Sequence, residues 1–140
     1  MADISAELIT YLKSKSGITA LVGSSTGARI YPDKPKQAVA RPLVVVSQAA
    51  GMTHRPLSGA PQIQSSTFDI ESHADTRAGA DALSTAIHAE MTSDNKTMGS
   101  TFVTEVATEL HRDAGDYLPI DGSDTSVYWC RSRYTLWHLI

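Results

Sequence analysis

The sequence has very little cysteine, the residue type that small proteins use for cross-links and for cysteine-rich metal sites. Cys130 is the single cysteine among 140 residues, which excludes an internal disulfide and a cysteine-rich metal site. The chain has no apolar run of about 18 residues, the length that a membrane-spanning helix needs. It also has no basic start followed by an apolar stretch. We therefore expect neither a signal peptide nor a membrane span, and we expect synthesis in the cytoplasm.

An excess of positive charge is also missing. The formal net charge is −3, whereas nucleic-acid-binding domains usually carry a basic face, because neutralising phosphates supplies much of their affinity. The cations Lys34, Lys36 and Arg41 are interrupted by prolines and lie beside Asp33, a pattern typical of a solvated loop. The sequence argues against a protein that grips nucleic acid.

What is present is an ordinary globular composition. Hydrophobic residues make up 41% and charged residues 19% of the chain, a balance that argues against disorder. A chain of this length is the size of one domain and buries roughly two thirds of its unfolded surface, so it needs no metal to fold. We expect a single domain over residues 1–140, without a cofactor.

Apolar residues at helical spacing predict two amphipathic helices. The first is predicted over Ile4–Lys13 with Asp3 as its N-cap, and a short helical turn over residues 18–22 follows it. The second is predicted over Thr76–Met91 with Asp75 as its N-cap. The apolar stripe of the second helix is expected to comprise Ala78, Ala82, Leu83, Ala86, Ile87 and Met91.

Segments rich in β-branched residues, or alternating in polarity, predict the strands. The expected strands cover residues 29–31, 43–49, 63–74, 101–111 and 125 to nearly 140. Long loops are expected at 50–62 and 112–124, and shorter ones at 32–42 and 92–100. Neither long loop holds a crossover helix, so each pair of long strands should be antiparallel. These patterns predict an α+β fold, a mostly antiparallel sheet with two helices on one face.

The last strand carries different residues at its alternate positions. One set is Tyr128, Cys130, Tyr134 and Leu136, and the other is Val127, Trp129, Arg131, Arg133 and Trp137. Because only one face can meet the helices, we expect the second set to expose tryptophan and arginine together, a composition enriched at protein interfaces. The alternative is a twisted strand whose two ends bury opposite faces.

Two patterns match enzyme motifs in part. Residues 23–27 fit the G-x-S-x-G motif with Ser25 as nucleophile, but a helical turn precedes them where that motif needs a strand. His88 and Glu90 fit the H-x-E pattern of zinc deaminases, but one cysteine cannot complete that metal site. The other histidines do not pair at metal-ligand spacing. We expect no catalytic or metal-binding residue, and we expect His88 on the helix surface.

The segment between residues 105 and 124 is acidic. It contains Glu105, Glu109, Asp113, Asp116, Asp121 and Asp124. Their spacing lacks the regular alternation of oxygens around a glycine turn that a calcium loop needs. A solvated acidic edge is the simplest interpretation. The alternative is an acidic surface facing a DNA channel, where like charge keeps DNA from sticking.

A series of short segments follows a recognisable order from Ile4 to Trp137. The segments are Leu8 with Tyr11-Leu12, Ile18 to Gly23, Arg29 to Pro32, Pro42 to Gln48, His54 with Leu57-Ser58-Gly59, Phe68 to Glu71, Thr76 to Ala78 with Ala82-Leu83, Asp116-Tyr117, and Arg133 to Trp137. In order and spacing they resemble the tail-terminator, or tail-completion, proteins of long-tailed phages, prophages and gene transfer agents. Residues 118–121 depart from the family pattern by lengthening the last loop.

The resemblance implies a function. Such proteins form a ring, commonly of six subunits, on the head-proximal end of the tail tube, where the ring stops tube polymerisation and joins the tube to the DNA-filled head. The implied partners are other copies of the chain, the major tail tube protein and a head-side neck or connector protein, while DNA passes through without specific binding. The implied location is the virion tail, with no membrane partner and no catalytic residue. The alternatives are another neck or minor tail component, and a small serine hydrolase using Ser25.

A ring of identical subunits needs two different patches on each subunit. The two long loops and the tryptophan and arginine face of the last strand are the expected patches. The candidate interface residues are His54, Arg55, Leu57, Tyr117, Leu118, Ile120, Trp129, Arg131 and Arg133.

Overall fold

The structure is a computed structural model that describes residues 4–23, 28–33, 41–54, 63–92, 96–98, 101–117 and 126–139. The elements in chain order are α1 (Ile4–Lys13), α2 (Ser16–Val22), β1 (Ile30–Pro32), β2 (Leu43–His54), β3 (Ile63–Ala74), α3 (Arg77–Met91), β4 (Lys96–Met98), β5 (Thr101–Tyr117) and β6 (Val127–Leu139). The strands of the described residues form one six-stranded sheet in the order β1-β2-β3-β6-β5-β4.

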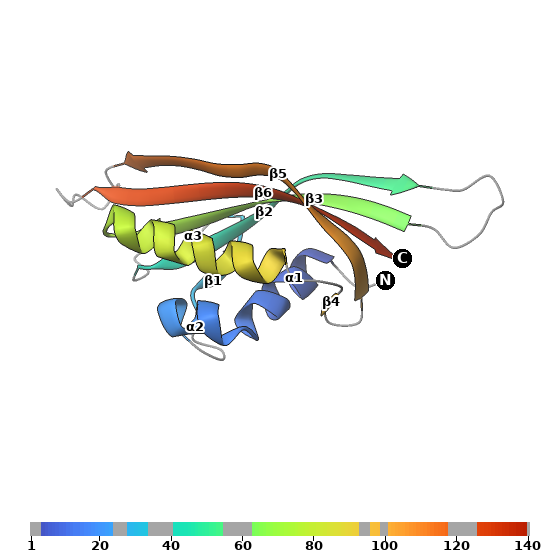
Figure 1. Cartoon of the computed structure of the whole chain (residues 1–140), viewed down its shortest axis with the longest axis horizontal. Helices are drawn as coiled ribbons and strands as arrows, with labels where there is room; N and C mark the ends of the chain where they lie inside the picture. Colours follow the sequence, from blue (N-terminus) through green and yellow to red (C-terminus); the bar gives the residue numbers. More distant parts are fainter. Residues whose placement is uncertain are drawn as a thin grey trace.

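The sheet is antiparallel except at one edge. The long strands β2, β3, β6 and β5 pair antiparallel in that order, β4 continues the pattern, and β1 runs parallel to β2. The three helices lie on one side of the sheet and leave the other side uncovered (Figure 1). This confirms the predicted α+β class, with α2 joining the two expected helices in the covering layer.

The core lies between the helices and the covered face of the sheet. Phe68 of β3 and Tyr134 of β6 are cross-strand partners at its centre, and both are fully buried. The helices contribute Leu8, Leu12, Leu83, Ile87 and Met91, which are buried as well. Burying one such side chain contributes roughly 1.5–3 kcal/mol, so this layer is the main source of stability.

The sequence places α1 correctly from end to end, but α3 differs from its prediction in two respects. Thr76 caps α3, since its hydroxyl oxygen accepts a hydrogen bond from the Gly79 N–H at 3.0 Å. Asp75 instead forms an ion pair with Arg41, at 2.7 Å. Asp3, the predicted cap of α1, lies outside the described residues.

The buried stripe of α3 is also rotated relative to the prediction. The buried residues are Ala80, Leu83, Ser84, Ile87 and Met91. Ala78 and Ala82 are exposed and Ala86 is only partly buried. The large side chains set the face that packs, because they bury far more apolar area than an alanine does. Small residues beside them then fall on either side of the stripe.

Two strands, β2 and β5, are longer than their sequence patterns indicate. β2 continues to His54 through residues predicted as a loop, and β5 continues from His111 to Tyr117. The short strand β4 also lies in a predicted loop. Backbone pairing with β3 and β6 extends these strands over glycine and small residues whose own strand preference is weak. The remainders of the two long loops, 55–62 and 118–124, lie outside the described residues, as does residue 125, the predicted start of the last strand.

Candidate interface on the open face of the sheet

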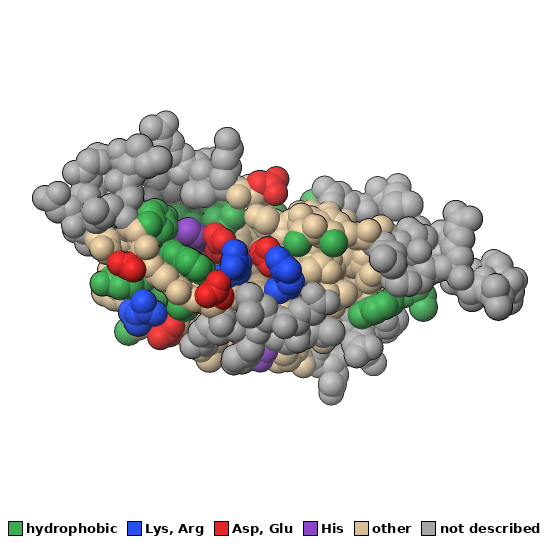
Figure 2. Space-filling model, turned by 90° about the horizontal axis from the view of Figure 1, so that it is seen from above, with side chains coloured by type: hydrophobic (Ala, Val, Ile, Leu, Met, Phe, Trp, Pro, Cys, Tyr) green, Lys and Arg blue, Asp and Glu red, His purple; other side chains and the backbone are tan. Residues whose placement is uncertain are grey.

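The open face is the side of the sheet that the helices leave uncovered. It is formed by alternate residues of β3, β6 and β5: Thr67, Asp69, Glu71 and His73; Trp129, Arg131, Arg133, Thr135 and Trp137; Asp113, Gly115 and Tyr117. Acidic and basic side chains lie next to one another across this face (Figure 2). The predicted division of β6 is confirmed, since Cys130, Tyr134 and Leu136 are buried against the helix layer. Val127, at the start of β6, is also buried although it shares the parity of Trp129.

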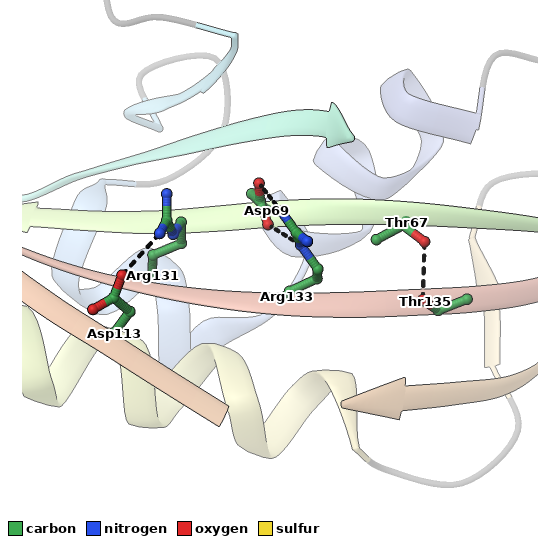
Figure 3. Close-up of polar contacts among 6 residues, drawn as sticks. All are labelled: Thr67, Asp69, Asp113, Arg131, Arg133 and Thr135. Carbon is green, nitrogen blue, oxygen red and sulfur yellow. Dashed lines mark hydrogen bonds and ion pairs between the residues drawn. The ribbon is translucent and has the colours of Figure 1, made fainter. Parts of the chain in front are cut away.

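Arg133 forms the best-defined ion pair of the open face. Its Nε and Nη2 atoms donate to the two carboxylate oxygens of Asp69, its cross-strand partner, at 2.8 and 3.1 Å (Figure 3). Paired donors of this kind fix both side chains, because the planar guanidinium matches the carboxylate. The hydrogen bonds from Arg133 lower the pKa of Asp69 below its ordinary value of 3.8, although burial of the carboxyl group opposes this. Asp69 therefore stays ionised well into the acidic range.

The rows on either side of this pair are also occupied by matched partners. Arg131 lies between Glu71 of β3 and Asp113 of β5, and its Nη2 donates to Asp113 at 2.8 Å. On the other side, the hydroxyls of Thr67 and Thr135 hydrogen-bond to each other at 3.0 Å (Figure 3). Opposite charges and hydroxyl pairs across strands each add a modest stabilisation. The open face is thus a ladder of partners within the same chain.

Beyond Arg131, this row of cross-strand pairs ends in an aromatic corner, formed by His73, Gly115, Tyr117 and Trp129. His73, Trp129 and Gly115 share one row across β3, β6 and β5. A Cβ atom at Gly115 would lie 2.7 Å from Cζ2 of Trp129, so the indole occupies the space that a side chain would fill. Tyr117 reaches across to His73, with its hydroxyl 3.0 Å from Nδ1. The missing side chain at Gly115 lets Trp129 lie against β5.

One further contact, with Glu71, holds His73 in place. Nε2 of His73 lies 3.2 Å from a carboxylate oxygen of Glu71, so both ring nitrogens have partners. Burial raises the pKa of the Tyr117 phenol above its ordinary value of 10.0. The positive charge of Arg41 opposes this rise, and the negative charge of Glu71 adds to it. The phenol is therefore neutral at physiological pH and acts as a hydrogen-bonding group.

The structure brings four of the predicted interface residues onto this one face. Tyr117, Trp129, Arg131 and Arg133 lie on the open face, with Tyr117 41% exposed. The backbone of His54 ends β2, and its side chain lies outside the described part of the structure. Arg55, Leu57, Leu118 and Ile120 lie outside the described residues altogether.

From the sequence, Arg131 and Arg133 are expected to contact another protein. Their acidic partners within the same chain were not predicted. Asp69 and Glu71 alternate on β3 as Arg131 and Arg133 do on β6, and this matched spacing is the signal that pairs them once the strands are neighbours. Asp113 was predicted to lie in a loop, as part of a solvated acidic edge, and its pairing with Arg131 was therefore not predicted.

The residues of the two partial enzyme motifs and the single cysteine lie in different parts of the chain. Ser25 lies outside the described residues. His88 does not lie freely on the helix surface as predicted, because its Nδ1 is 3.0 Å from the hydroxyl of Tyr134. The thiol of Cys130 is buried and lies 3.1 Å from a carboxylate oxygen of Asp81. Within the described ranges no group of three potential ligands is placed to hold a metal ion. No helix in those ranges is long and apolar enough to cross a membrane.

The fold and this paired face define a class of protein, a two-layer α+β domain with helices on one face of its sheet and paired polar residues on the other. A chain of the same fold occurs in the "Virion of native gene transfer agent (GTA) particle". The match has a TM-score of 0.64 and covers 97% of this chain and 96% of that one. At 14% sequence identity the likeness shows the fold alone. No curated protein matches the chain in sequence.

The family of the chain is shown by its sequence. The profile of the family "Tail completion protein gp17" matches residues 6–119, which is well over half of the chain. The chain therefore belongs to this family, and it is a structural protein of a phage-type virion tail.

Proposed function

We propose that the chain forms a ring of identical copies, six in number, at the head-proximal end of the tail tube. The ring ends polymerisation of the tube and joins the tube to a neck or connector protein of the head. The match of residues 6–119 to a tail completion family carries this proposal. The protein acts by contacts with its neighbours and performs no catalysis.

The open face of the sheet is the surface that we assign to a neighbouring virion protein. Covering a charged group is costly unless the group keeps a partner, and Arg131 and Arg133 already have theirs within the chain. Tyr117 and Trp129 add aromatic surface beside them, which is typical of the centre of protein interfaces. A neighbouring protein can therefore cover Arg131 and Arg133 while each keeps its ion pair within the chain.

The charge of the chain suits a passage for DNA. With a formal net charge of −3, the subunit has no excess of cations to bind phosphates tightly. DNA that enters or leaves the head passes the ring without being held. This part of the proposal expects no measurable binding of duplex DNA at physiological salt.

Deletion of the gene that encodes the chain tests the proposal. Without the ring, electron micrographs should show overlong tubes, or tails unattached to heads, and expression of the intact chain in the same cells should restore joined particles of normal tube length. Tubes of normal length that fail to join heads would assign the chain to another part of the neck. Normal, infectious particles in the deletion strain would contradict the proposal.

Exchanging the two members of one ion pair tests the role of the open face. The double variant Asp69→Arg with Arg133→Asp keeps an ion pair within the chain but inverts the charge pattern that a neighbour meets. We expect near-normal thermal stability and at least about tenfold weaker binding to tube ends. Ala89→Glu, on the exposed side of α3, is the matched control and should bind normally. Equal binding by all three proteins would remove the open face from the interface.

A further inference from the structure

β2 has one backbone edge that is only partly covered. One side of β2 pairs with β3 from Leu43 to His54, whereas the other side pairs with β1 over Val44–Val46. Among the described segments no strand pairs with that outer side from Ser47 onward. β2 and β3 extend together past the helices at this end of the molecule (Figure 1). Within the part of the chain that the structure describes, this stretch of the edge is therefore available to another strand.

The hydrogen bonds to β1 show which groups of β2 point outward. The Val44 N–H donates to the Arg29 carbonyl at 2.8 Å, and the Val46 carbonyl accepts from the Asp33 N–H at 2.9 Å. Alternate residues of a strand direct their backbone groups to the same side. The register shift between Gln48 and Ala50 changes the parity. Beyond it, Gly51 and Thr53 direct their N–H and C=O groups to the outer edge.

The outer part of β2 lacks the residues that usually guard an edge strand. Residues 47–54 read Ser-Gln-Ala-Ala-Gly-Met-Thr-His and contain no lysine, arginine, acid or proline. Natural edge strands commonly carry charges or prolines that prevent pairing with another chain. Residues 48–51 are exposed, and three of them are alanine or glycine, over which a second backbone can approach closely. This composition favours an edge that is covered by another strand.

β5 has the complementary edge on the opposite side of the sheet. It pairs with β6 along its length, and on its other side with β4 over Thr101–Val103. In the described part of the chain, residues 104–117 have no strand on that side. The segment carries Glu105, Glu109, Asp113 and Asp116 against Arg112. If two β5 edges met, their acidic residues would repel each other. The outer part of β2 carries no acid, so it does not repel the acids of β5.

The strand directions allow the two edges to join. β2 and β5 are separated by three successive antiparallel pairings, so they run in opposite directions. A second copy placed beside the first in the same orientation brings its β5 antiparallel to β2, which is the more stable kind of pairing.

The uncovered segments also lie at the same height along the strands. Ser47 is aligned with Leu110 through the Asp69–Arg133 row, and Gly51 is aligned with Val106 through the next rows. The register of β5 shifts between Leu110 and Asp113, at the level of Val46 where β1 ends. This irregularity separates the uncovered segment of β5 from the part that would meet β1.

We infer that residues 47–54 of β2 pair with residues 104–110 of β5 in the next copy of the chain, so that the ring is held by one continuous sheet. The inference rests on the proposed ring and names its subunit interface. Pairing of two different edges is heterologous, the kind of contact that builds a ring when the rotation between copies closes. Pairing of β2 with a second β2 is isologous and stops at a dimer.

Amide hydrogen exchange of the free chain and of the assembled chain, alone or on tail tubes, tests the inference. Assembly should slow exchange at least about tenfold at Gly51, Thr53 and within residues 104–110, because hydrogen-bonded amides exchange only when the pairing opens. A ring in which these amides are unchanged overturns the strand pairing and leaves the proposed function intact. Protection of β2 alone, in a dimer, assigns an isologous contact and also overturns it. A chain that stays monomeric even on tubes overturns both proposals.

A pair of substitutions at one position supplies the second test. Thr53→Pro removes an outward N–H while leaving the pairing with β3, and Thr53→Val keeps that N–H. Both variants should remain folded as free chains, as judged by thermal unfolding. Thr53→Pro should lower assembly at least about tenfold, and Thr53→Val should assemble normally. Normal assembly of a folded Thr53→Pro chain overturns the inference.

Discussion

The two faces of the sheet are held by different kinds of interaction, although the residues concerned are neighbours in sequence. Phe68 is fully buried against the helices, while Thr67 and Asp69 on either side of it lie on the open face. The covered face derives its stability from apolar area and close packing. The open face derives it from ion pairs and hydroxyl pairs, each worth little alone. We conclude that stability resides mainly on one face, which leaves the other available for contacts.

The largest contrast between the faces is expected at Phe68. Phe68→Ala leaves a cavity at the centre of the core and should lower the free energy of unfolding by about 3–5 kcal/mol. Domains of this size are stable by only about 5–15 kcal/mol, so the variant should lose a large part of its stability. Urea denaturation followed by circular dichroism measures the change. A loss below about 1 kcal/mol would contradict the assignment of the core.

The next largest effect is expected where a backbone atom of the open face meets an aromatic ring. Gly115→Ala places a Cβ atom 2.7 Å from Cζ2 of Trp129, and the indole must move. We expect a loss of about 1–3 kcal/mol in the free energy of unfolding, together with a shift in tryptophan emission. In the control Gly51→Ala the new Cβ meets the flexible amide of Gln48 at 3.2 Å. If the two variants were equally stable and had the same emission, Trp129 would not pack on Gly115.

A smaller effect with a distinct pH dependence is expected for the central ion pair. Asp69→Asn should lower the free energy of unfolding by about 1 kcal/mol at pH 7. The folded chain lowers the pKa of Asp69 below its ordinary value of 3.8. The pair therefore stabilises the fold fully above that unfolded pKa and loses its effect as the pH falls through the lower folded pKa.

Denaturant unfolding of the wild type and Asp69→Asn between pH 7 and pH 2 measures this dependence. The difference between the two proteins should be constant near neutrality and shrink under acid conditions. A difference that grew on acidification would mean that the pair does not favour the ionised carboxylate.

The smallest effect is expected at Thr67, next to the most sensitive residue of the core. Thr67→Ala removes one hydroxyl pair with Thr135 and should lower the free energy of unfolding by about 0.5–1 kcal/mol. A double-mutant cycle with Thr135→Ala isolates the interaction between the two side chains. An effect as large as that of Phe68→Ala would show that the open face, too, contributes to the core.

Much of this architecture can be predicted from the sequence, because apolar periodicity identifies the elements. Helix α1 and strand β3 have the bounds that their patterns indicate, and the two faces of β6 follow from simple alternation. Strand length is harder to predict: β5 runs through Gly115 because β6 pairs with it, and that partner is distant in sequence.

The candidate interface is predictable in its aromatic and basic residues but not in its pairing. Trp129, Arg131 and Arg133 stand out by residue type, whereas the role of Asp69 depends on the order of the strands. The strand order is set by long-range contacts, and no local pattern encodes them. The uncovered edge of β2 could not be foreseen for the same reason, since it is defined by where β1 ends.

The position of Cys130 has a practical consequence. Its thiol is the single one in the sequence, is 1% exposed, and lies between the sheet and α3 beside Asp81. A maleimide dye can reach it only when α3 lifts from the sheet, so a cysteine introduced at a surface position can be labelled without first removing the native one. The rate at which the Cys130 thiol is labelled would, in turn, measure how often α3 detaches from the sheet.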